Sequence, residues 1–385
     1  MSRRPALVGP APPERLGRAV QAWFRRAHRP LPWRGSRDPY RVWVAEVLLQ
    51  QTRVEQAVPY FDRFVARFPD VVALARARAS EVLKLWQGAG YYARARHLHA
   101  AARRIVAVHG GTLPRTVTEL ERLPGIGPYT ARAIAAIAFG APVVPVDANA
   151  LRVAARWTRE ERDPRSAGAR SSLVAYLERA LPPADPAGFA EGLMELGETV
   201  CRPRAPRCGR CPAAFGCRAV REMRDPATLP RPRERPSRPH IRAAVVVLER
   251  GGRWLVQRRP EPGLLGGLWE FPGGKIRRGE AVEGAARREL REETGASAGP
   301  LRFVGVVRHG YSHFTVELHV FRGRARRPPV LGPQRRWARP SEVLRLPLPR
   351  ATELVIQALR SPPGRRTRRR GRAPSPTNGG TRASR

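Results

Sequence analysis

The sequence lacks the features that mark a membrane or secreted protein. It has no run of 18 apolar residues, so no transmembrane helix is expected. Its N-terminus has no apolar core long enough for a signal peptide. Only four of its 385 residues are cysteines. We therefore expect a cytoplasmic protein with no membrane partner, in which thiols stay reduced.

Acidic residues and lysine are also scarce. The chain carries 72 Lys and Arg residues, of which only two are lysines, against 32 Asp and Glu, for a net charge of +40. The base composition of a genome can favour arginine over lysine, but it does not explain the excess of basic over acidic residues. Because this excess is spread along the chain, it predicts binding to a polyanion such as nucleic acid.

The four cysteines are grouped into one short segment. They are Cys201, Cys208, Cys211 and Cys217, all within 17 residues. Grouped cysteines in a cytoplasmic protein usually bind metal. Structural zinc prefers two CxxC pairs, and here only the middle pair has that spacing, whereas a four-thiolate iron–sulfur cluster tolerates uneven loops. The spacing favours an iron–sulfur cluster and leaves zinc as the alternative.

Changes in hydrophobic periodicity predict two folded domains. Residues 1–220 are mostly helical in pattern, and the proline-rich residues 221–240 are predicted to be a linker. Strand-like segments then surround one helix near residues 283–293, so residues 241–360 should form an α+β domain. Residues 361–385 have no apolar periodicity and are predicted to be a disordered basic tail.

A Gly-x-Gly turn in the first domain predicts contact with phosphate. The segment LPGIGPYTARAIA contains Gly125 and Gly127, followed by Pro128 at a first helical position. Backbone amides at such a helix start face outward and can bind a phosphate. Ordinary helix connections also use such turns, so the glycines alone are weak evidence.

Two carboxylates in the same domain predict opposite protonation states. Glu46 falls on the apolar face of a helix that Asp38 would cap, where burial would keep the carboxyl protonated. Asp147 precedes another helix, and capping that helix would favour its ionised form. The alternatives are a charged residue at the edge of a helix face and an ordinary helix cap. Together, an acid and an anion set apart by environment can break a glycosidic bond, so with the turn and the cysteines they predict a DNA N-glycosylase.

Several longer motifs resemble the adenine DNA glycosylase family, within the helix-hairpin-helix glycosylase superfamily. They are LPWR, DPYRVWVAEVLLQQT, LPGIGPYTARAIAAIAFG, VDANALRV and the cysteine spacing, between about residues 15 and 220. The resemblance implies an all-α helix-hairpin-helix DNA glycosylase domain whose iron–sulfur loop holds a [4Fe–4S] cluster. It also implies a monomer that binds double-stranded DNA and removes adenine from 8-oxoG:A or G:A pairs.

The resemblance assigns roles to three candidate catalytic residues. Glu46 would protonate adenine at N7, and Asp147 would stabilise the cationic sugar. Tyr129 stands where strand-cleaving relatives carry a lysine, so Schiff-base chemistry is not expected, and Tyr129 would support the Asp147 side of the site. The family has glycine where this chain has Ala148, which must accept the backbone angles of that glycine.

Five further residues match the family's substrate contacts. Trp33, Arg34 and Glu191 match the adenine pocket. Gln51 matches the residue that wedges into the base stack while the adenine is flipped, and Tyr91 lines the strand near the opposite base. Without the resemblance, Trp33 and Tyr91 would be interpreted as core aromatics and Gln51 as a helix-end amide. Ala89 replaces a bulky residue of the family near the lesion, a change that would loosen discrimination of the opposite base.

The second domain contains a complete Nudix signature. Its carboxylates Glu289, Glu292 and Glu293 are spaced i, i+3 and i+4, so they share one helix face, and such oxygen ligands suit Mg²⁺ or Mn²⁺. The alternative for RELREE alone is an exposed helix with Arg/Glu pairs.

The second domain also resembles the part of adenine glycosylases that recognises 8-oxoguanine in DNA. The residues that match its lesion-reading loop are Tyr311, Ser312 and His313. Two functions follow for this α+β Nudix domain. It recognises the lesion in DNA, which we favour, or it additionally or instead hydrolyses 8-oxo-dGTP or a related oxidised nucleotide with Mg²⁺.

Overall fold

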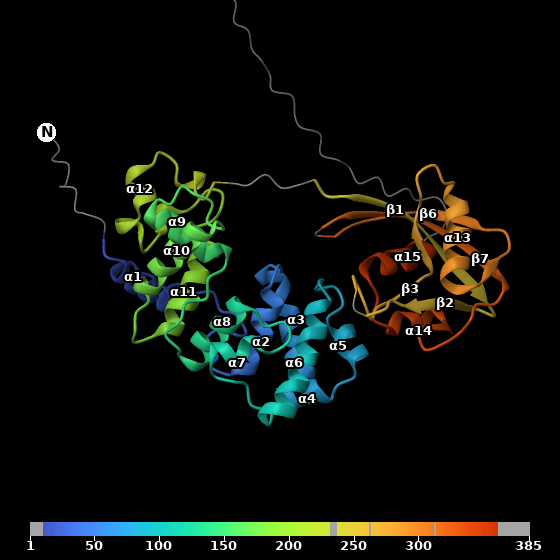
Figure 1. Ribbon diagram of the computed structural model, residues 1–385, viewed down its shortest axis with the longest axis horizontal. Coiled ribbons are helices and arrows are strands. Elements are labelled where there is room, and N and C mark those ends of the chain that lie inside the picture. The colour runs from blue at the N-terminus through green and yellow to red at the C-terminus, as the bar shows by residue number, and fades with distance from the viewer. Residues whose placement is uncertain (1–10, 232–236, 262, 312, 361–385) are drawn as a thin grey trace, which may run out of the picture. The chain divides into compact units, whose positions relative to one another are not determined.

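The computed structural model describes residues 11–231, 237–261, 263–311 and 313–360 (Figure 1). Two predictions concern residues outside this part of the chain: Ser312 of the lesion-reading loop and the disordered tail at 361–385. Within the described residues, no helix combines the length and the apolar character needed to cross a membrane.

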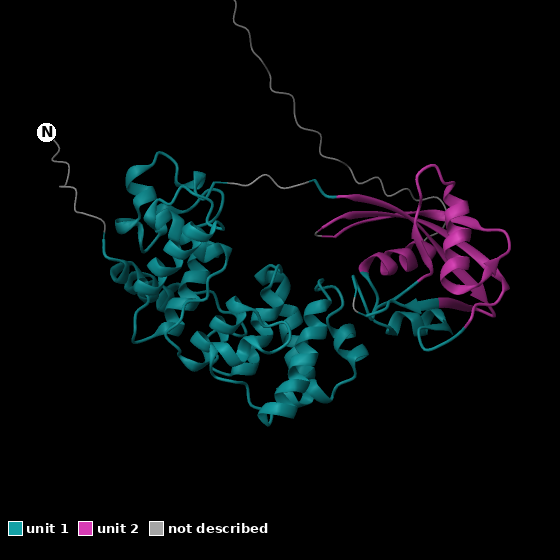
Figure 2. Cartoon of the chain, viewed as in Figure 1, with its two compact units in different colours: residues 1–238, 256–270, 331–349 teal, residues 239–255, 271–330, 350–385 magenta. Residues whose placement is uncertain are grey.

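The chain divides into two compact units, which Figure 2 shows in different colours. Unit 1 contains Met1–Arg238, Val256–Glu270 and Leu331–Pro349, and unit 2 contains Pro239–Leu255, Phe271–Val330 and Arg350–Arg385. Because the units interleave along the chain, the domain boundaries expected from the sequence remain predictions.

Unit 1 is mainly helical. Its α-helices are α1 (Pro13–Ala27), α2 (Pro39–Leu49), α3 (Val54–Arg67), α4 (Val71–Arg76), α5 (Ala79–Leu85), α6 (Ala93–His109), α7 (Val117–Glu121), α8 (Pro128–Phe139), α9 (Ala148–Thr158), α10 (Ala167–Ala180), α11 (Pro186–Thr199), α12 (Arg218–Glu222) and α14 (Pro340–Arg345). Short 3-10 helices are η1 (Cys208–Arg210), η2 (Ala214–Gly216) and η3 (Pro226–Thr228). Strand β3 (Trp269–Glu270) pairs antiparallel with the end of β2 (Arg253–Arg258), and β8 (Arg335–Ala338) precedes α14.

Aspartate side chains set the start of four α-helices in unit 1, one of which is α4, capped by Asp70. Asp38 accepts a hydrogen bond from the backbone N–H of Tyr40 at 2.9 Å, with proline at the first position of α2. Asp147 caps α9 by accepting from the Ala150 N–H at 2.7 Å, and Asp185 caps α11 in the same way. The two caps predicted from the sequence, at residues 38 and 147, are confirmed.

Unit 1 contains two hydrophobic cores. The first is formed mainly by α2 to α8, and the second by α1, α9, α10, α11 and the cysteine loop. Helix α11 packs against α8 of the first group and against α9 of the second. The elements that carry the candidate catalytic side chains therefore meet where the two cores adjoin.

Unit 2 is built on a mixed sheet. Strand β1 (His240–Arg250) pairs in parallel with β7 (Thr315–Arg327) and antiparallel with β4 (Gly273–Lys275). Strands β5 (Ser297–Ala298) and β6 (Arg302–Gly310) each pair antiparallel with β7. Helix α13 (Val282–Thr294) packs on β1, and α15 (Arg350–Arg360) packs on β6. The helix expected near residues 283–293 is thus confirmed as α13.

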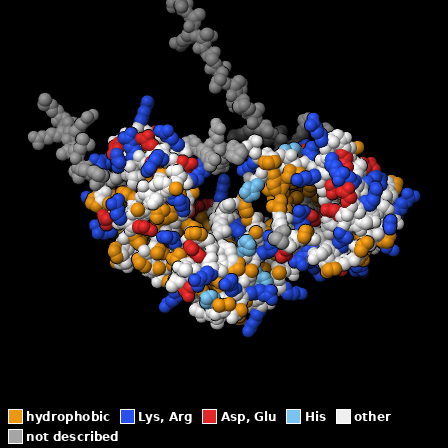
Figure 3. Space-filling model, viewed as in Figure 1, with side chains coloured by type: hydrophobic (Ala, Val, Ile, Leu, Met, Phe, Trp, Pro, Cys, Tyr) orange, Lys and Arg blue, Asp and Glu red, His pale blue; other side chains and the backbone are white. Residues whose placement is uncertain are grey.

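Basic side chains are spread over the visible surface of both units instead of forming one patch (Figure 3). Arg103 and Arg104 of α6 are examples of exposed arginines in unit 1. A field of this kind attracts a polyanion to many faces and does not by itself locate a binding site.

Candidate active site

Glu46 lies on α2 as a buried carboxyl with only 6% of its surface exposed. Its pKa is raised to about 7, mainly by burial and also by the nearby charges of Asp147 and Glu191. The Tyr129 hydroxyl, by hydrogen bonding, and the Arg34 charge oppose this shift. A carboxyl with this pKa is protonated in a large fraction of molecules near neutral pH. The burial of Glu46 that the sequence predicted is confirmed.

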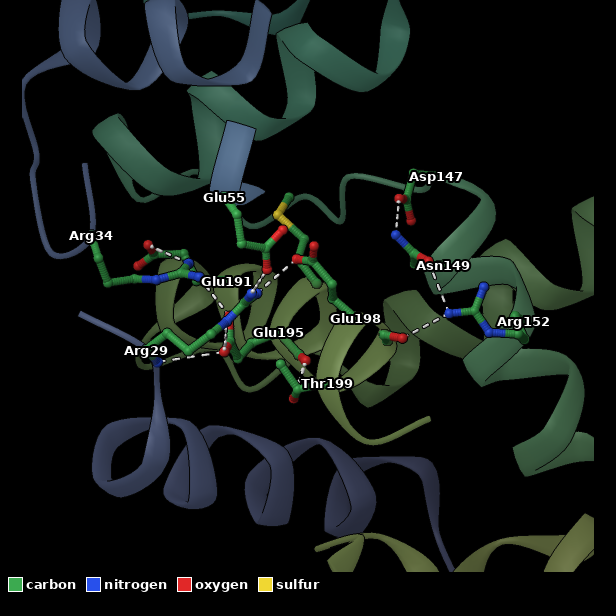
Figure 4. Close-up of polar contacts among 12 residues, drawn as sticks. Arg29, Arg34, Glu55, Asp147, Asn149, Arg152, Glu191, Glu195, Glu198 and Thr199 are labelled. Atoms are coloured by element: carbon green, nitrogen blue, oxygen red, sulfur yellow. Dashed lines mark hydrogen bonds and ion pairs between the residues drawn. The ribbon is translucent and has the colours of Figure 1, made fainter. Parts of the chain in front are cut away.

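Asp147 is held in place by two hydrogen bonds from its own helix. One comes from the Ala150 backbone, and the other from Asn149 Nδ2 to the second carboxyl oxygen at 2.9 Å (Figure 4). Asn149 Oδ1 in turn accepts from Arg152, whose Nε donates to the carbonyl of Cys201 at 2.9 Å. Ala148 is the first helical residue of α9 and has no left-handed backbone, so replacing glycine there costs little.

Arg34 is fixed over the site by two glutamates of α11. Its guanidinium donates to Glu191 at 3.0 Å and to Glu195 at 2.9 Å, and Arg29 binds Glu195 and Glu198 at 2.7 Å each (Figure 4). The Glu195 side chain is only 1% exposed. Sequence reasoning missed Glu195 and Arg29. The available signal was the i, i+4, i+7 spacing of three glutamates on one helix.

A cavity beside these groups contains four of the predicted site residues. Its lining consists of Leu31, Trp33, Arg34, Val42, Ala45, Glu46, Leu49, Val54, Ile137, Glu191, Met194, Glu195 and Glu198. Trp33 also packs edge-on against Phe61 at 5.2 Å, so it is both a core aromatic and a wall of the cavity. Tyr129, expected on the Asp147 side, interacts with Glu46 as well as with Asp147 and donates to the Met194 sulfur at 3.7 Å.

Gln51 and Tyr91 lie in loops with left-handed backbone angles. Their φ values are 60° and 47°, a region that residues other than glycine rarely adopt. Gln51 follows the end of α2 with its side chain exposed, and Tyr91 precedes α6 and is half-buried. Both loops are bound by the same side chain, Arg94 of α6.

The Gly-x-Gly turn is exposed and opens α8 as predicted. Gly125 has a φ of 76° and no room for a side chain, because a Cβ there would meet His97. Gly127 is the residue before the first helical position, and Ile126 between the glycines is buried. The buried isoleucine anchors the turn while its two glycines face solvent, which suits close approach of a phosphate.

Comparisons with known proteins find two matching family models and several related sequences. A family model described as "HhH-GPD superfamily base excision DNA repair protein" matches residues 44–178, and one described as "NUDIX domain" matches residues 243–358. Adenine DNA glycosylase of Homo sapiens is 34% identical over 79% of this chain and 66% of its own length. The corresponding protein of Mus musculus is 35% identical over 78% of this chain and 68% of its own length.

The chain belongs to the adenine DNA glycosylase family. It spans about two thirds of the length of the two mammalian relatives. A solved thermostable thymine-DNA glycosylase is 27% identical over 54% of this chain and 95% of its own, with a TM-score of 0.49. Family membership confirms the predicted two-domain fold class and the predicted enzyme class, a DNA glycosylase followed by a Nudix domain.

The four cysteines of this adenine glycosylase family member are free thiols close enough to influence one another. Burial, followed by interaction with the other cysteines, raises the pKa of Cys211 to about 12 and that of Cys217 to about 11. Arg156 of α9 donates to the Cys201 sulfur at 3.3 Å, and its carbonyl accepts from Cys217.

Among the residues with described positions, no three His, Cys, Asp or Glu side chains are placed to hold a single metal ion. The [4Fe–4S] cluster expected from the cysteine spacing therefore remains a prediction. Family members and Nudix domains are generally linked to metal cofactors.

The Nudix glutamates lie on α13 beside a glycine loop. Glu293 accepts from the Gly273 N–H at 2.9 Å, and a Cβ at Gly274 would overlap the Glu289 carboxyl. Arg288 binds Glu289 at 2.7 Å and Glu292 at 2.9 Å. The helix places two carboxyls against the loop and leaves Glu292 more exposed, so the three do not share one environment.

The candidate lesion-reading loop connects β6 and β7 within unit 2. Tyr311 stacks on Phe314 with ring centroids 4.7 Å apart, and His309 packs edge-on against Tyr311 at 4.6 Å. His313 is exposed. The stacked Tyr311–Phe314 pair and the exposed His313 therefore belong to the same loop.

Proposed function

We propose that the protein removes adenine paired with 8-oxoguanine or guanine by hydrolysing the N-glycosidic bond. The observation that carries the proposal is the buried Glu46 carboxyl, with a pKa of about 7, lining the cavity between α2 and α11. A general acid needs a pKa near the working pH, and burial supplies it here.

In this mechanism Glu46 gives its proton to N7 of the flipped adenine. The bond between N9 and C1′ then breaks, and its electron pair leaves with the base. Asp147, whose carboxylate accepts hydrogen bonds from Ala150 and Asn149, stabilises the cationic sugar until water adds. Tyr129 has no amine to attack the sugar, so the DNA strand stays intact. Its hydroxyl holds the Glu46 carboxyl instead.

Recognition of adenine follows from the groups around the cavity. Adenine presents an amino donor at N6 and acceptors on its rings. The Glu191 carboxylate can accept from the amino group, while the Arg34 guanidinium, anchored by Glu191 and Glu195, supplies donors. The Trp33 ring forms an apolar wall for the flipped base.

The remaining parts bind the DNA around this pocket. The Gly125 and Gly127 turn would bind backbone phosphate. Tyr311 and His313 would recognise 8-oxoguanine in the opposite strand. The substrate is double-stranded DNA, and the protein is proposed to act on it as a cytoplasmic, nucleoid-associated monomer.

The cysteine loop would hold the [4Fe–4S] cluster. The four ligands are Cys201, Cys208, Cys211 and Cys217, and the cluster would supply the positive charge that keeps the thiols ionised. Its role in this mechanism is structural, because it would fix the loop whose Cys201 carbonyl binds Arg152.

We further infer that the Nudix domain recognises the lesion and does not hydrolyse nucleotides. Arg288 already binds two of the three carboxylates that Mg²⁺ or Mn²⁺ would need. Pyrophosphate release from 8-oxo-dGTP with either ion tests this alternative. Release that is lost on changing Glu293 to Gln would establish a second activity, and no release is expected.

The glycosylase itself is tested on a duplex that holds one 8-oxoG:A pair. Alkali should break the strand at the adenine position after incubation with the protein, and without alkali the strand should stay intact. A G:A duplex should be cut in the same way, and an 8-oxoG:C duplex serves as control. An intact strand after alkali would reject the proposed function.

A further inference from the structure

Arg94 is a buried arginine whose contacts join two loops. Only 9% of its surface is exposed, and burial lowers its pKa to about 10, which still leaves it charged at neutral pH. Its Nη1 donates to three carbonyls, those of Val47 at 2.8 Å, Leu48 at 2.9 Å and Gln50. These are carbonyls at the C-terminal end of α2, which have no partner within the helix.

The second terminal nitrogen of Arg94, Nη2, binds the second loop and also one residue of the first. Nη2 donates to the carbonyls of Ala89 at 3.1 Å and Gly90 at 3.2 Å, and to Thr52 Oγ1 at 3.1 Å. The guanidinium also lies over the Tyr91 ring at 5.5 Å. One planar group thus binds residues 47–52 and residues 89–91 together.

Each of these two loops contains one residue with a strained backbone to which the family resemblance assigns a role in DNA binding. Gln51 and Tyr91 both have left-handed backbone angles. Such angles are unfavourable for residues other than glycine and persist only when the surroundings enforce them. Arg94 is the side chain that contacts the loops of both. The helix that it caps, α2, also carries Glu46 one position before Val47.

We propose that Arg94 is a positioning residue that holds Gln51 and Tyr91 in the geometry that opens the base pair. This inference rests on the proposed function. Arg94 does not touch the adenine cavity, so its effect is on extruding the base and not on breaking the bond. It matters most where the adenine is firmly stacked and paired, because the wedge must then supply more of the unstacking energy.

The test compares Arg94→Gln and Arg94→Lys with wild type on two duplexes. One holds a single 8-oxoG:A pair in fully paired DNA. The other holds the same pair beside a mismatched neighbour, where extruding the adenine costs less. Arg104→Gln, which removes an exposed charge from the same helix, is the matched control. Single-turnover excision is measured on both duplexes, and 2-aminopurine fluorescence next to the adenine reports unstacking separately.

We expect Arg94→Gln to slow excision about tenfold or more on the fully paired duplex and about threefold or less on the weakened one. Arg94→Lys keeps the charge but cannot reach both loops. It should also slow excision more on the fully paired duplex than on the weakened one, by smaller factors. Arg104→Gln should stay within about twofold of wild type on both.

An equal loss on both duplexes would overturn the inference, since damage to the fold slows both alike. Wild-type rates in Arg94→Gln would overturn it as well. If Arg94→Gln fails to fold, the excision rates of Arg94→Lys on the two duplexes test the inference in the same way. If wild type excises adenine from neither duplex, the proposed function itself fails. An active wild type with an unaffected Arg94→Gln rejects only the role of Arg94.

Discussion

The protein contains two groups of glutamates whose surroundings give them opposite properties. In unit 1, Glu46 is buried and forms no ion pair among the described residues, so burial raises its pKa to about 7. In unit 2, two of the three Nudix glutamates of α13, Glu289 and Glu292, form ion pairs with Arg288. The adjacent Glu280, also bound by Arg288, has its pKa lowered to about 2 by that hydrogen bond.

The comparison shows that the amino-acid type does not decide whether a carboxyl donates a proton or stays an anion. Burying a carboxyl away from water, with no opposite charge paired to it, raises its pKa, so that the group can act as an acid. An arginine beside a surface carboxylate stabilises its ionised form and binds its oxygens. The first arrangement suits glycosidic bond cleavage, and the second favours a domain whose helix is held together by ion pairs.

Changing Glu46 to Gln should slow adenine excision about a thousandfold, because the amide cannot donate the proton to N7. Single-turnover strand cleavage after alkali measures the rate, and a gel-shift titration checks that duplex binding is retained. A variant that keeps a tenth of the wild-type rate would mean that the proton comes from another group.

Raising the pH should slow wild-type excision about fiftyfold between pH 7 and pH 9, because about half of the Glu46 carboxyl is protonated at pH 7 and about 1% at pH 9. The folded pKa of Glu46 is raised to about 7, so the protonated form dominates below that pH and falls about tenfold for each unit above it. Single-turnover rates at saturating protein separate this effect from DNA binding. The residual rate of the Glu46→Gln variant should be flat over the same range. A wild-type rate that rises with pH would assign Glu46 the role of a base.

Replacing Asn149 with alanine should slow excision about tenfold, because the Asp147 carboxylate loses one of its two hydrogen bonds. The same single-turnover assay measures the loss. Ser171→Ala, an exposed change on α10, is the control and should have no effect. An unchanged rate in Asn149→Ala would show that the cap from Ala150 alone orients Asp147.

Changing Glu289 to Gln should leave adenine excision within about twofold of wild type, because this carboxyl belongs to the second group. The rate is compared with that of Glu46→Gln on the same 8-oxoG:A duplex. A loss of tenfold or more would mean that the two groups of glutamates do not act independently.

The parts of the fold that the sequence predicted correctly depend on near neighbours. The Asp38 and Asp147 caps, the exposed turn at Gly125 and the helix α13 each follow from a few consecutive residues. Helix caps and glycine turns are local in origin, so they can be read from the chain alone. The family resemblance, which rests on longer motifs, was likewise confirmed by the comparisons.

The sequence by itself therefore determined the helix starts, the two kinds of domain, the grouping of the cysteines and the family. Tertiary structure alone decided the chemistry of the side chains. The pKa of Glu46 depends on burial and on Asp147 and Glu191, which are distant in the chain. The contact of Arg34 with Glu195 crosses 161 positions, and Arg94 joins loops more than 35 residues apart. Electrostatic environment is set by what surrounds a group in space, and no pattern of neighbouring residues records it.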